Sequence, residues 1–431
     1  MDNIILKSLS VENFASFADL ISFTTEADLS KKEHLENTFA EGDARYNKVS
    51  FIYGSNGSGK TYFCKIIREI QRLLLWSPLT TTDSTRLRAI PQLKELDASV
   101  KPFAFDTGYQ EKPTNFAIDI VLDGVTYHYA FSIQGKKVVS ETLTKKHRRT
   151  EKLIERTSSS YKDITLRSEL KSFETAKQVV KEEALCLPIA GMLNNPLAKK
   201  IVDAISGIRA VNMAASRANP VNPKETFSDE RLEKYMRIIR KADPTIRNIK
   251  VSLAEEEVAR QKIEADDFEN KEIIAKKTTV AIDSIHAVYE NGQEKHSTPI
   301  AFFADESLGT IKLFTALPHL FDVLETGGTL VIDELENGLH LSLAKEIVKL
   351  FTSEESNPYH AQLICTSHQP LLLAGDYRRD QVWVTTKDQS GKSSLHRMTK
   401  IKTPRAKVNL ADRILEGALG CNPDLFFDNN T

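Results

Sequence analysis

The chain has 431 residues, of which 41% are hydrophobic and 27% charged, as expected of a globular protein with a substantial core. Lysine plus arginine (58) balances aspartate plus glutamate (59), which excludes a general attraction to nucleic acid and confines any such contact to a local patch. The four cysteines form no C-x-x-C pair, so we predict neither a disulfide framework nor a zinc site. No signal peptide is evident and no run approaches about 18 apolar residues, so we expect a cytoplasmic protein that does not span a membrane.

The first elements of the chain are predicted to be β-strands. Residues 4–23 alternate apolar and polar side chains, which predicts an opening hairpin. Residues 24–48 are polar and show no clear period. Residues 49–53 then form a short apolar run that is typical of a buried strand.

An eight-residue glycine-rich loop follows this strand and fits the pattern G-x-x-x-x-G-K-[ST]. Apolar residues recur at helical spacing directly after the loop, so strand, loop and helix come in the order that a phosphate-binding loop requires. The glycines allow backbone N–H groups to point at phosphates, and the helix adds its positive end. We predict that Lys60 reaches the β- and γ-phosphates of ATP and that the Thr61 hydroxyl ligates Mg²⁺. The predicted nucleotide-binding residues of this loop are Gly54, Ser55, Asn56, Gly57, Ser58, Gly59, Lys60 and Thr61.

An antiparallel lobe is predicted next to the phosphate-binding loop. Residues 116–122 and 125–133 alternate like strands around an Asp123-Gly124 turn. A nucleotide-binding core built only of βαβ units would not need this hairpin. We therefore expect residues 1–140 to form the N-terminal part of a nucleotide-binding head together with this lobe.

An insertion is predicted to follow the lobe. Residues 141–276 are highly charged and are predicted to be mostly helical, with one clear amphipathic helix over 228–242. Residues 277–303 return to strand character around an Asn291-Gly292 turn. We expect residues 277–431 to form the C-terminal part of the head.

Two adjacent carboxylates end the apolar run from Thr329 to Ile332. A phosphate-binding loop needs an acidic partner at a strand end to hold Mg²⁺, and Asp333 has that position. Glu334 then lies where a carboxylate could orient and deprotonate the attacking water. The pairing of these two roles predicts hydrolysis, because a kinase would instead exclude water.

Two further motifs could contact the phosphates. His368 comes shortly after the apolar run 362–366, and an imidazole there could donate to the γ-phosphate. Ser307 and Gly309 lie at the predicted start of a helix, where a hydroxyl and free N–H groups can bind an anion.

Together these motifs resemble those of the ATP-binding-cassette superfamily. More narrowly, they resemble the RloA-type ATPases, relatives of the ATPase half of OLD-family (overcoming lysogenization defect) nucleases. The resemblance implies an α/β fold with an ABC- or SMC-like P-loop ATPase head, an antiparallel β lobe and a helical insertion. The segments that carry it are 9–14, 54–61, 242–246, 306–310, 331–340 and 366–368.

The resemblance also implies roles for individual residues. Ser307 and Gly309 would form the signature motif, which closes over ATP held by another subunit, so the active unit would be a homo-dimer or higher homo-oligomer. Glu334 would be the general base, residues 337–340 the loop that crosses the dimer seam, and His368 the switch residue. This chain departs from the pattern at Leu308, where transporters have glycine. The glutamine of the Q-loop, a further motif of the superfamily, is not assigned to any residue of this sequence.

RloA-type proteins are typically encoded beside a toxic effector, often a TOPRIM-like nuclease, in bacterial anti-phage defence. Only about 60 residues follow His368, and none shows an acidic D-x-D array after a strand. The resemblance therefore implies a sensor or scaffold ATPase that controls a separate nuclease or toxin.

Other interpretations share part of this evidence. A DNA-repair ATPase of the SMC or RecF type has the same motifs; its usual long coiled coil and zinc hook are missing here, but RecF-like members lack the coil too. A transporter subunit is disfavoured by the long separation between the P-loop and Ser307, and a small-molecule kinase by Glu334. The basic runs 145–149 and 397–407 are the candidate sites for contact with DNA. Neither run has interleaved aromatic residues on which bases could stack.

Overall fold

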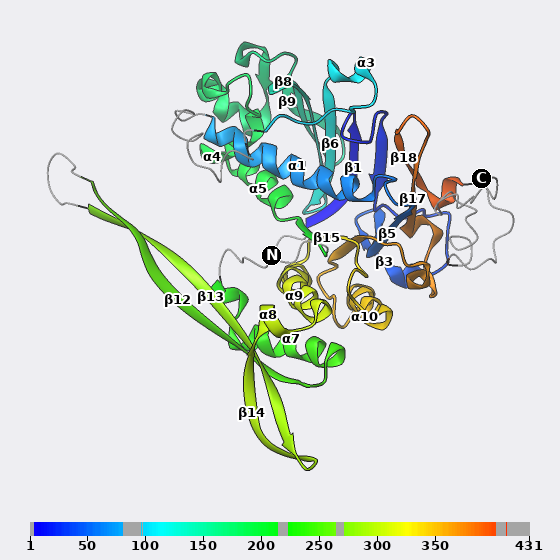
Figure 1. Cartoon of the computed structure of the whole chain (residues 1–431). Helices are drawn as coiled ribbons and strands as arrows, with labels where there is room; N and C mark the ends of the chain where they lie inside the picture. The colour runs from blue at the N-terminus through cyan, green and yellow to red at the C-terminus, as the bar shows by residue number, and fades with distance from the viewer. Residues whose placement is uncertain are drawn as a thin grey trace, which may run out of the picture. The chain divides into compact units, whose positions relative to one another are not determined.

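The computed structural model describes residues 4–80, 96, 98–213, 223–263, 271–401 and 411. The chain divides into two compact units (Figure 1). The first comprises Met1–Asn212, His319–Glu336 and Ala344–Thr431, and the second comprises Met213–Pro318 and Asn337–Leu343. Within the described ranges, no helix is both long and apolar enough to cross a membrane.

A six-stranded sheet in the first unit carries the sequence motifs at its strand ends. In spatial order its strands are β11 (Arg209–Asn212), β15 (Thr329–Asp333), β16 (Gln362–Thr366), β5 (Val49–Gly54), β17 (Val382–Lys387) and β18 (Ser393–Arg397). The first five strands are parallel, and β18 pairs antiparallel with β17. Every residue of β5, β15 and β16 is buried, which explains why their sequences are mostly apolar rather than alternating.

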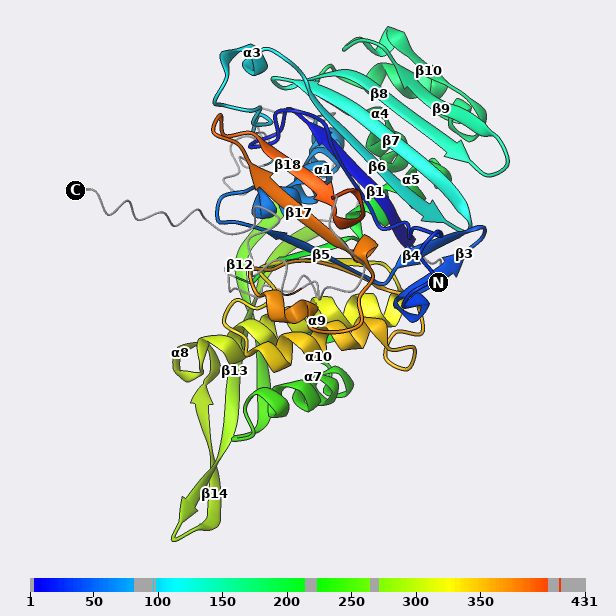
Figure 2. The same cartoon turned by 90° about the vertical axis from the view of Figure 1, so that its right-hand side faces the viewer.

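A seven-stranded antiparallel sheet forms the predicted lobe (Figure 2). Its strands, in spatial order, are β10 (Ile164–Leu166), β9 (Thr150–Arg156), β8 (Lys137–Lys146), β7 (Val125–Gln134), β6 (Thr114–Leu122), β1 (Ile4–Glu12) and β2 (Ile21–Thr24). The predicted opening hairpin is the pair β1 and β2. The predicted turn joins β6 to β7, with φ of 51° at Asp123 and 73° at Gly124.

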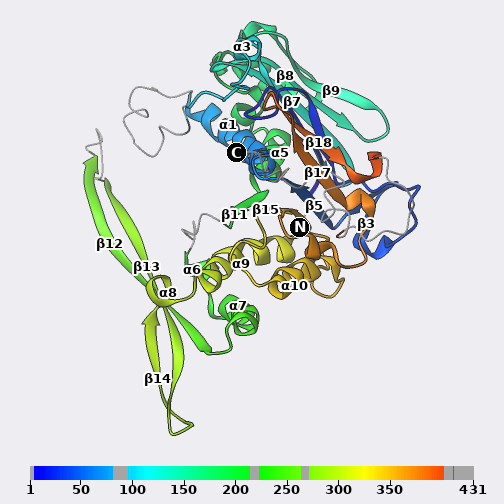
Figure 3. The same cartoon turned by 45° about the vertical axis from the view of Figure 1, so that its right-hand side comes forward.

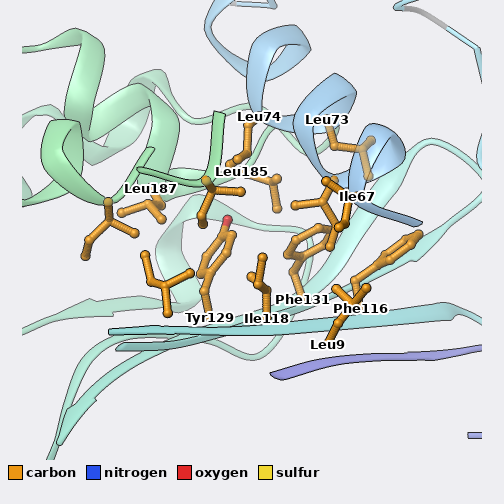
Figure 4. Packing of buried hydrophobic residues seen from close by; sticks show 14 of the residues in the cluster. Leu9, Ile67, Leu73, Leu74, Phe116, Ile118, Tyr129, Phe131, Leu185 and Leu187 are labelled. Carbon is orange, nitrogen blue, oxygen red and sulfur yellow. The ribbon is translucent and has the colours of Figure 1, made fainter. Parts of the chain in front are cut away.

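The main hydrophobic core lies between the inner face of this sheet and the helices α1 (Lys60–Leu79), α4 (Cys186–Met192) and α5 (Pro196–Ser206). Figure 4 shows Ile67, Leu73 and Leu74 of α1 facing Phe116 and Phe131 of the sheet. The helix α1 follows the phosphate-binding loop of residues 54–61, called the P-loop from here on. Burial of one apolar face fixes α1 against the sheet, and this packing sets the position of its first turn.

Shorter elements complete the first unit. They are the hairpin β3 (Thr38–Glu41) and β4 (Ala44–Asn47), the helix α3 (Thr107–Gln110) and the helix α10 (Leu341–Thr352), which starts in the second unit. The 3-10 helices are Leu35–Asn37, Tyr161–Asp163, Ser168–Val179, Pro370–Leu373, Arg379–Gln381 and Met398–Lys400.

Three of the four cysteines, Cys64, Cys186 and Cys365, are buried and free.

The second unit contains a long three-stranded antiparallel sheet with the order β12-β13-β14 (Figure 3). Its strands are β12 (Ile246–Ile263), β13 (Lys271–Glu290) and β14 (Gln293–Ala301). The predicted turn at Asn291-Gly292 joins β13 to β14, with positive φ at both residues. The helices are α6 (Pro223–Thr226), α7 (Asp229–Ala242), α8 (Phe302–Asp305) and α9 (Leu308–Thr326), which continues into the first unit.

The structure confirms the α/β class and the antiparallel lobe, but the prediction of a mostly helical segment over 141–276 is wrong. Its first part continues the antiparallel sheet through β8, β9 and β10, and its last part is the 18-residue strand β12. The same stretch also contains the helices α4, α5 and α6. The predicted amphipathic helix is α7, with Ser228 at its N-cap position. The predicted boundaries at 140 and 276 stay predictions.

Candidate functional site

Three strand ends bring the predicted motifs together in the first unit. β16 lies between β5 and β15, and all three strands are parallel, so their carboxyl ends meet at the same edge of the sheet. The P-loop follows β5, Asp333 ends β15, and His368 comes two residues after β16. The order of the strands, rather than the order of the sequence, assembles the site.

The P-loop has the conformation that its glycines permit. Gly57 and Gly59 have φ of 75° and 113°, and Gly59 is the N-cap residue of α1. A Cβ atom at Gly54 would lie 2.2 Å from the side-chain oxygen of Thr385 on β17, so only glycine fits there. The loop thus directs the N-terminal N–H groups of a 20-residue helix at the edge of the sheet, as an anion site requires.

Lys60 lies over this loop. Its Nζ donates hydrogen bonds to the backbone oxygens of Gly54 (2.7 Å) and Ser55 (3.0 Å), and the residue is 5% exposed. Ser58 is fixed from the other side, because its Oγ lies 2.7 Å from Thr385 Oγ1. Thr61 follows in the first turn of α1 and is half-buried. The ammonium group is therefore held where phosphate oxygens would replace the two carbonyls.

Asp333 is a buried carboxylate held by two neighbouring strands. Thr366 at the end of β16 donates from Oγ1 to Asp333 Oδ1 (2.8 Å), and Asn212 at the end of β11 donates from Nδ2 to Oδ2 (3.1 Å). The residue is 2% exposed. Across the described part of the chain no group of three or more histidine, cysteine or acidic residues could hold a metal. One carboxylate and the Thr61 hydroxyl are nevertheless a donor set that suits Mg²⁺, which takes further oxygens from phosphates and water.

Glu334 has a backbone conformation that is rare for a residue with a side chain. Its φ is 57°, and the peptide is held by hydrogen bonds from Glu334 N to Thr366 Oγ1 (2.8 Å) and from Leu335 N to Thr366 O (3.1 Å). The side chain is 30% exposed, so water has access to it. Such an over-determined outlier at the end of a strand is typical of a functional position.

His368 lies beside Glu334, with 4.0 Å between His368 Nε2 and Glu334 Oε1. Its backbone N–H donates to Glu336 Oε1. Partial burial, together with the positive charge of Lys60, lowers the pKa of His368 below its ordinary value of 6.5, against the opposing effect of the nearby carboxylates. Both effects favour the neutral imidazole, which has one N–H to donate.

Sequence reasoning missed three residues of this cluster. Thr366 is predicted as the end of a strand and as part of the motif 366–368, but with no role of its own, although its hydroxyl joins Asp333 to the Glu334 backbone. Asn212 falls in the segment that was predicted to be helical, and β11 has only four residues, too few for a strand pattern. No sequence pattern marks Glu336 as functional, apart from its position two residues after Glu334.

The signature residues lie in the second unit, at the start of α9. Ser307 Oγ accepts from Thr310 N (3.1 Å), which caps the helix, and Ser307 and Leu308 are exposed. A Cβ atom at Gly309 would lie 2.4 Å from Gly338 O, so this glycine lets the loop 337–340 pass close to the helix. Both segments present exposed residues, as surfaces that meet a second molecule must.

The basic runs fall in different settings. Residues 145–149 comprise the last two residues of β8 and the turn to β9, and Lys145 pairs with Glu151 (3.1 Å) and Glu169 (2.5 Å). Most of the run 397–407 lies outside the described residues. Contact with DNA at either run stays a prediction.

Residues 217–374 match the family model described as AAA domain, putative AbiEii toxin, Type IV TA system. The matched stretch covers less than half of the chain and contains Ser307, Asp333, Glu334 and His368, but it starts after the P-loop. This part of the chain is similar to an AAA-type domain, which agrees with the P-loop ATPase class that the motifs predict. No curated protein matches the chain.

Several solved structures are similar over nearly the whole chain. An SMC head domain from Thermotoga maritima has 13% identity and a TM-score of 0.38, and the match covers 92% of this chain and 99% of that chain. The recombination mediator protein RecF has 15% identity and a TM-score of 0.36, with 91% and 98% covered. An Smc head domain from Pyrococcus furiosus, bound to the C-terminal domain of ScpA, has 14% identity and a TM-score of 0.38, with 96% and 99% covered.

Proposed function

We propose that this chain is an ATPase that binds MgATP at its P-loop and hydrolyses it with Glu334 as general base. One observation carries the proposal: the P-loop, Asp333, Glu334 and His368 converge at the carboxyl edge of one parallel sheet. A phosphate cradle alone would also suit a binding protein. A carboxylate fixed beside the metal position and open to water adds the means of hydrolysis.

Each residue has a task that follows from its contacts. Lys60 offsets the charge of the β- and γ-phosphates, and Thr61 and Asp333 would hold Mg²⁺, which stabilises the charge that develops on the phosphates. Thr366 fixes both Asp333 and the backbone of Glu334, so that Glu334 can take a proton from the attacking water. The neutral His368 donates to a γ-phosphate oxygen.

We further propose that the active form is a homo-dimer or higher homo-oligomer with composite sites. Ser307 and Gly309 of one copy would close over the ATP bound by the P-loop of another. The exposed helix start at Ser307 and the exposed residues Gly338 and His340 support this arrangement, because all of them are available to a second copy. An exposed hydroxyl and free N–H groups at a helix start suit the γ-phosphate.

The hydrolysis proposal is tested by two lysine substitutions on the same helix. Lys60→Ala should lower ATP affinity and turnover by about 100-fold or more, since it removes the cation that offsets the phosphates. Lys65→Ala is the matched control, because Lys65 is exposed and its Nζ lies 4.9 Å from the centre of the Tyr62 ring. Equal phosphate release from the two variants would contradict the proposal.

The composite site is tested by complementation. Ser307→Arg should bind ATP yet fail to hydrolyse it, and Lys60→Ala should bind it only weakly. A mixed pair of the two variants has one site with an intact P-loop and an intact signature, so mixing should restore part of the turnover. Normal hydrolysis by Ser307→Arg alone would exclude a role for the second copy.

We also propose that this ATPase acts as a sensor or scaffold for a separate effector, a nuclease or toxin, in bacterial anti-phage defence. The motif resemblance supports this proposal. A DNA-repair ATPase of the SMC or RecF type is the second candidate, favoured by the same motif set. The neighbouring gene discriminates between them: a nuclease or toxin gene favours defence, and a replication or repair gene favours repair.

A further inference from the structure

The signature motif is joined directly to the three-stranded sheet of the second unit. β14 ends at Ala301 and α8 starts at Phe302 with no residue between them, and Glu306 and Ser307 follow α8. Phe302 is fully buried and its ring centroid lies 4.8 Å from that of Phe314 in α9. The backbone around Ser307 therefore follows the end of β14.

A side-chain contact joins the same motif to the central strand. His286 of β13 lies with Nε2 2.7 Å from Oε1 of Glu306, the residue directly before Ser307. The Glu306 side chain is 5% exposed and that of His286 is 18% exposed, so this carboxylate is shielded from water. A nearly buried carboxylate depends on its hydrogen-bond donor. The position of Glu306 is therefore set by His286.

His286 also connects the strands of the sheet to one another. It pairs with Ile246 of β12 on one side and with Thr298 of β14 on the other. The Nδ1 atom of His286 lies 3.3 Å from Oγ1 of Thr245, the residue directly before β12. The Thr245 hydroxyl in turn donates to Asp243 Oδ1 (2.6 Å). One side chain thus contacts the start of β12 and the approach to the signature motif. The segment 242–246, which the P-loop chemistry does not use, gains a role through this contact.

We propose that His286 is a positioning residue for the signature motif: its hydrogen bond to Glu306 holds Ser307 where Ser307 can reach the nucleotide of a second copy. This inference rests on the proposed function, because it requires that Ser307 acts on ATP. His286 itself touches no nucleotide in this arrangement. It fixes Glu306 to the sheet, and Glu306 fixes the first turn of α9.

Three histidine variants test the proposal. His286→Ala should lower turnover and the ATP-dependent pairing of chains by about tenfold, the scale of one hydrogen bond to a charged group, with unchanged ATP affinity of the single chain. His286→Gln should restore most of both, because the glutamine Nε2 can donate to Glu306 from nearly the same place. His296→Ala is the matched control, since His296 is an exposed residue of β14 in the same sheet. It should behave as the unmodified chain.

A double variant separates positioning from general damage. If His286 acts through Glu306, then His286→Ala combined with Glu306→Ala should lose no more turnover than either change alone. If circular dichroism shows that His286→Ala does not fold, the turnover of two Glu306 variants tests the proposal instead. Glu306→Gln keeps an acceptor for His286 and should have a far higher turnover than Glu306→Ala. Wild-type turnover of His286→Ala, or a glutamine variant as slow as the alanine variant, would overturn the proposal. Absence of turnover in the unmodified chain would instead refute the proposed function, and pairing would remain the readout for His286.

Discussion

Replacing Thr366 by valine tests how the site is built, because the substitution keeps the shape of the side chain and removes one oxygen. That oxygen donates to Asp333 Oδ1 (2.8 Å) and accepts from Glu334 N (2.8 Å), so one atom holds both the Asp333 carboxylate and the Glu334 backbone. Thr366 is fully buried, and water cannot easily replace the lost group. Asp333 would lose this hydrogen bond and keep the one from Asn212.

The expected size of the effect follows from those two bonds. A hydrogen bond to a carboxylate contributes about 1.5 to 3 kcal/mol, and an unsatisfied buried N–H costs about 1 to 3 kcal/mol. A combined loss of about 3 kcal/mol, expressed as misplacement of Asp333 and Glu334, corresponds to a fall in turnover of about 100-fold. The Mg²⁺ concentration needed for half-maximal turnover should rise as well, because Asp333 is the predicted metal ligand.

The assay is phosphate release at saturating ATP over a series of Mg²⁺ concentrations, with circular dichroism to check folding. Thr366→Ser is the control, since it keeps the oxygen and removes one buried methyl group, at a cost of about 1 kcal/mol. The serine variant should therefore stay close to the unmodified chain. A valine variant with normal turnover and an unchanged Mg²⁺ requirement would refute the role that the structure gives to Thr366.

Three further substitutions have expected outcomes. Glu334→Gln should keep ATP affinity within about twofold in calorimetry, stop turnover and hold chains together in ATP, because an amide accepts no proton from water; brisk phosphate release would exclude Glu334 as the base. Gly59→Ala should abolish nucleotide binding, since φ is 113° and the new Cβ would lie 2.9 Å from Ser393 Oγ; wild-type affinity would mean that the loop relaxes freely. Gly309→Ala should lower turnover but not affinity, because the Cβ would lie 2.4 Å from Gly338 O; unchanged turnover would show that this contact has no part in hydrolysis.

The nucleotide site could be predicted where its residues are contiguous. The P-loop is one octet between a strand and a helix, and Asp333 and Glu334 directly follow the apolar run that forms β15. In such segments the strand, the turn and the functional side chains are adjacent in the sequence. Local pattern was therefore sufficient for them, and also for the turns at Asp123-Gly124 and Asn291-Gly292.

The error over residues 141–276 has a physical cause. β8, β9 and β12 are rich in lysine, glutamate and arginine, which favour helices when they are considered residue by residue. These segments are strands because they pair with neighbours: β8 continues the lobe beside β7, and β12 pairs with β13 along nearly its whole length. Strand formation of this kind depends on a partner, which a single-sequence pattern does not contain.

By itself the sequence indicated the groups to which we assign the chemistry in our proposal: the phosphate loop, the acidic pair, His368 and the serine at the start of α9. Only the tertiary structure decided how those groups are held. Asn212 and Asp333 are separated by 121 positions in the chain, and Thr366 and Asp333 by 33, yet parallel pairing places their side chains within hydrogen-bond distance. The same holds for His286 and Glu306, which the antiparallel sheet brings together. Chemistry is a property of residue types and can be read locally, whereas positioning depends on contacts between distant segments, which exist only once the sheets have formed.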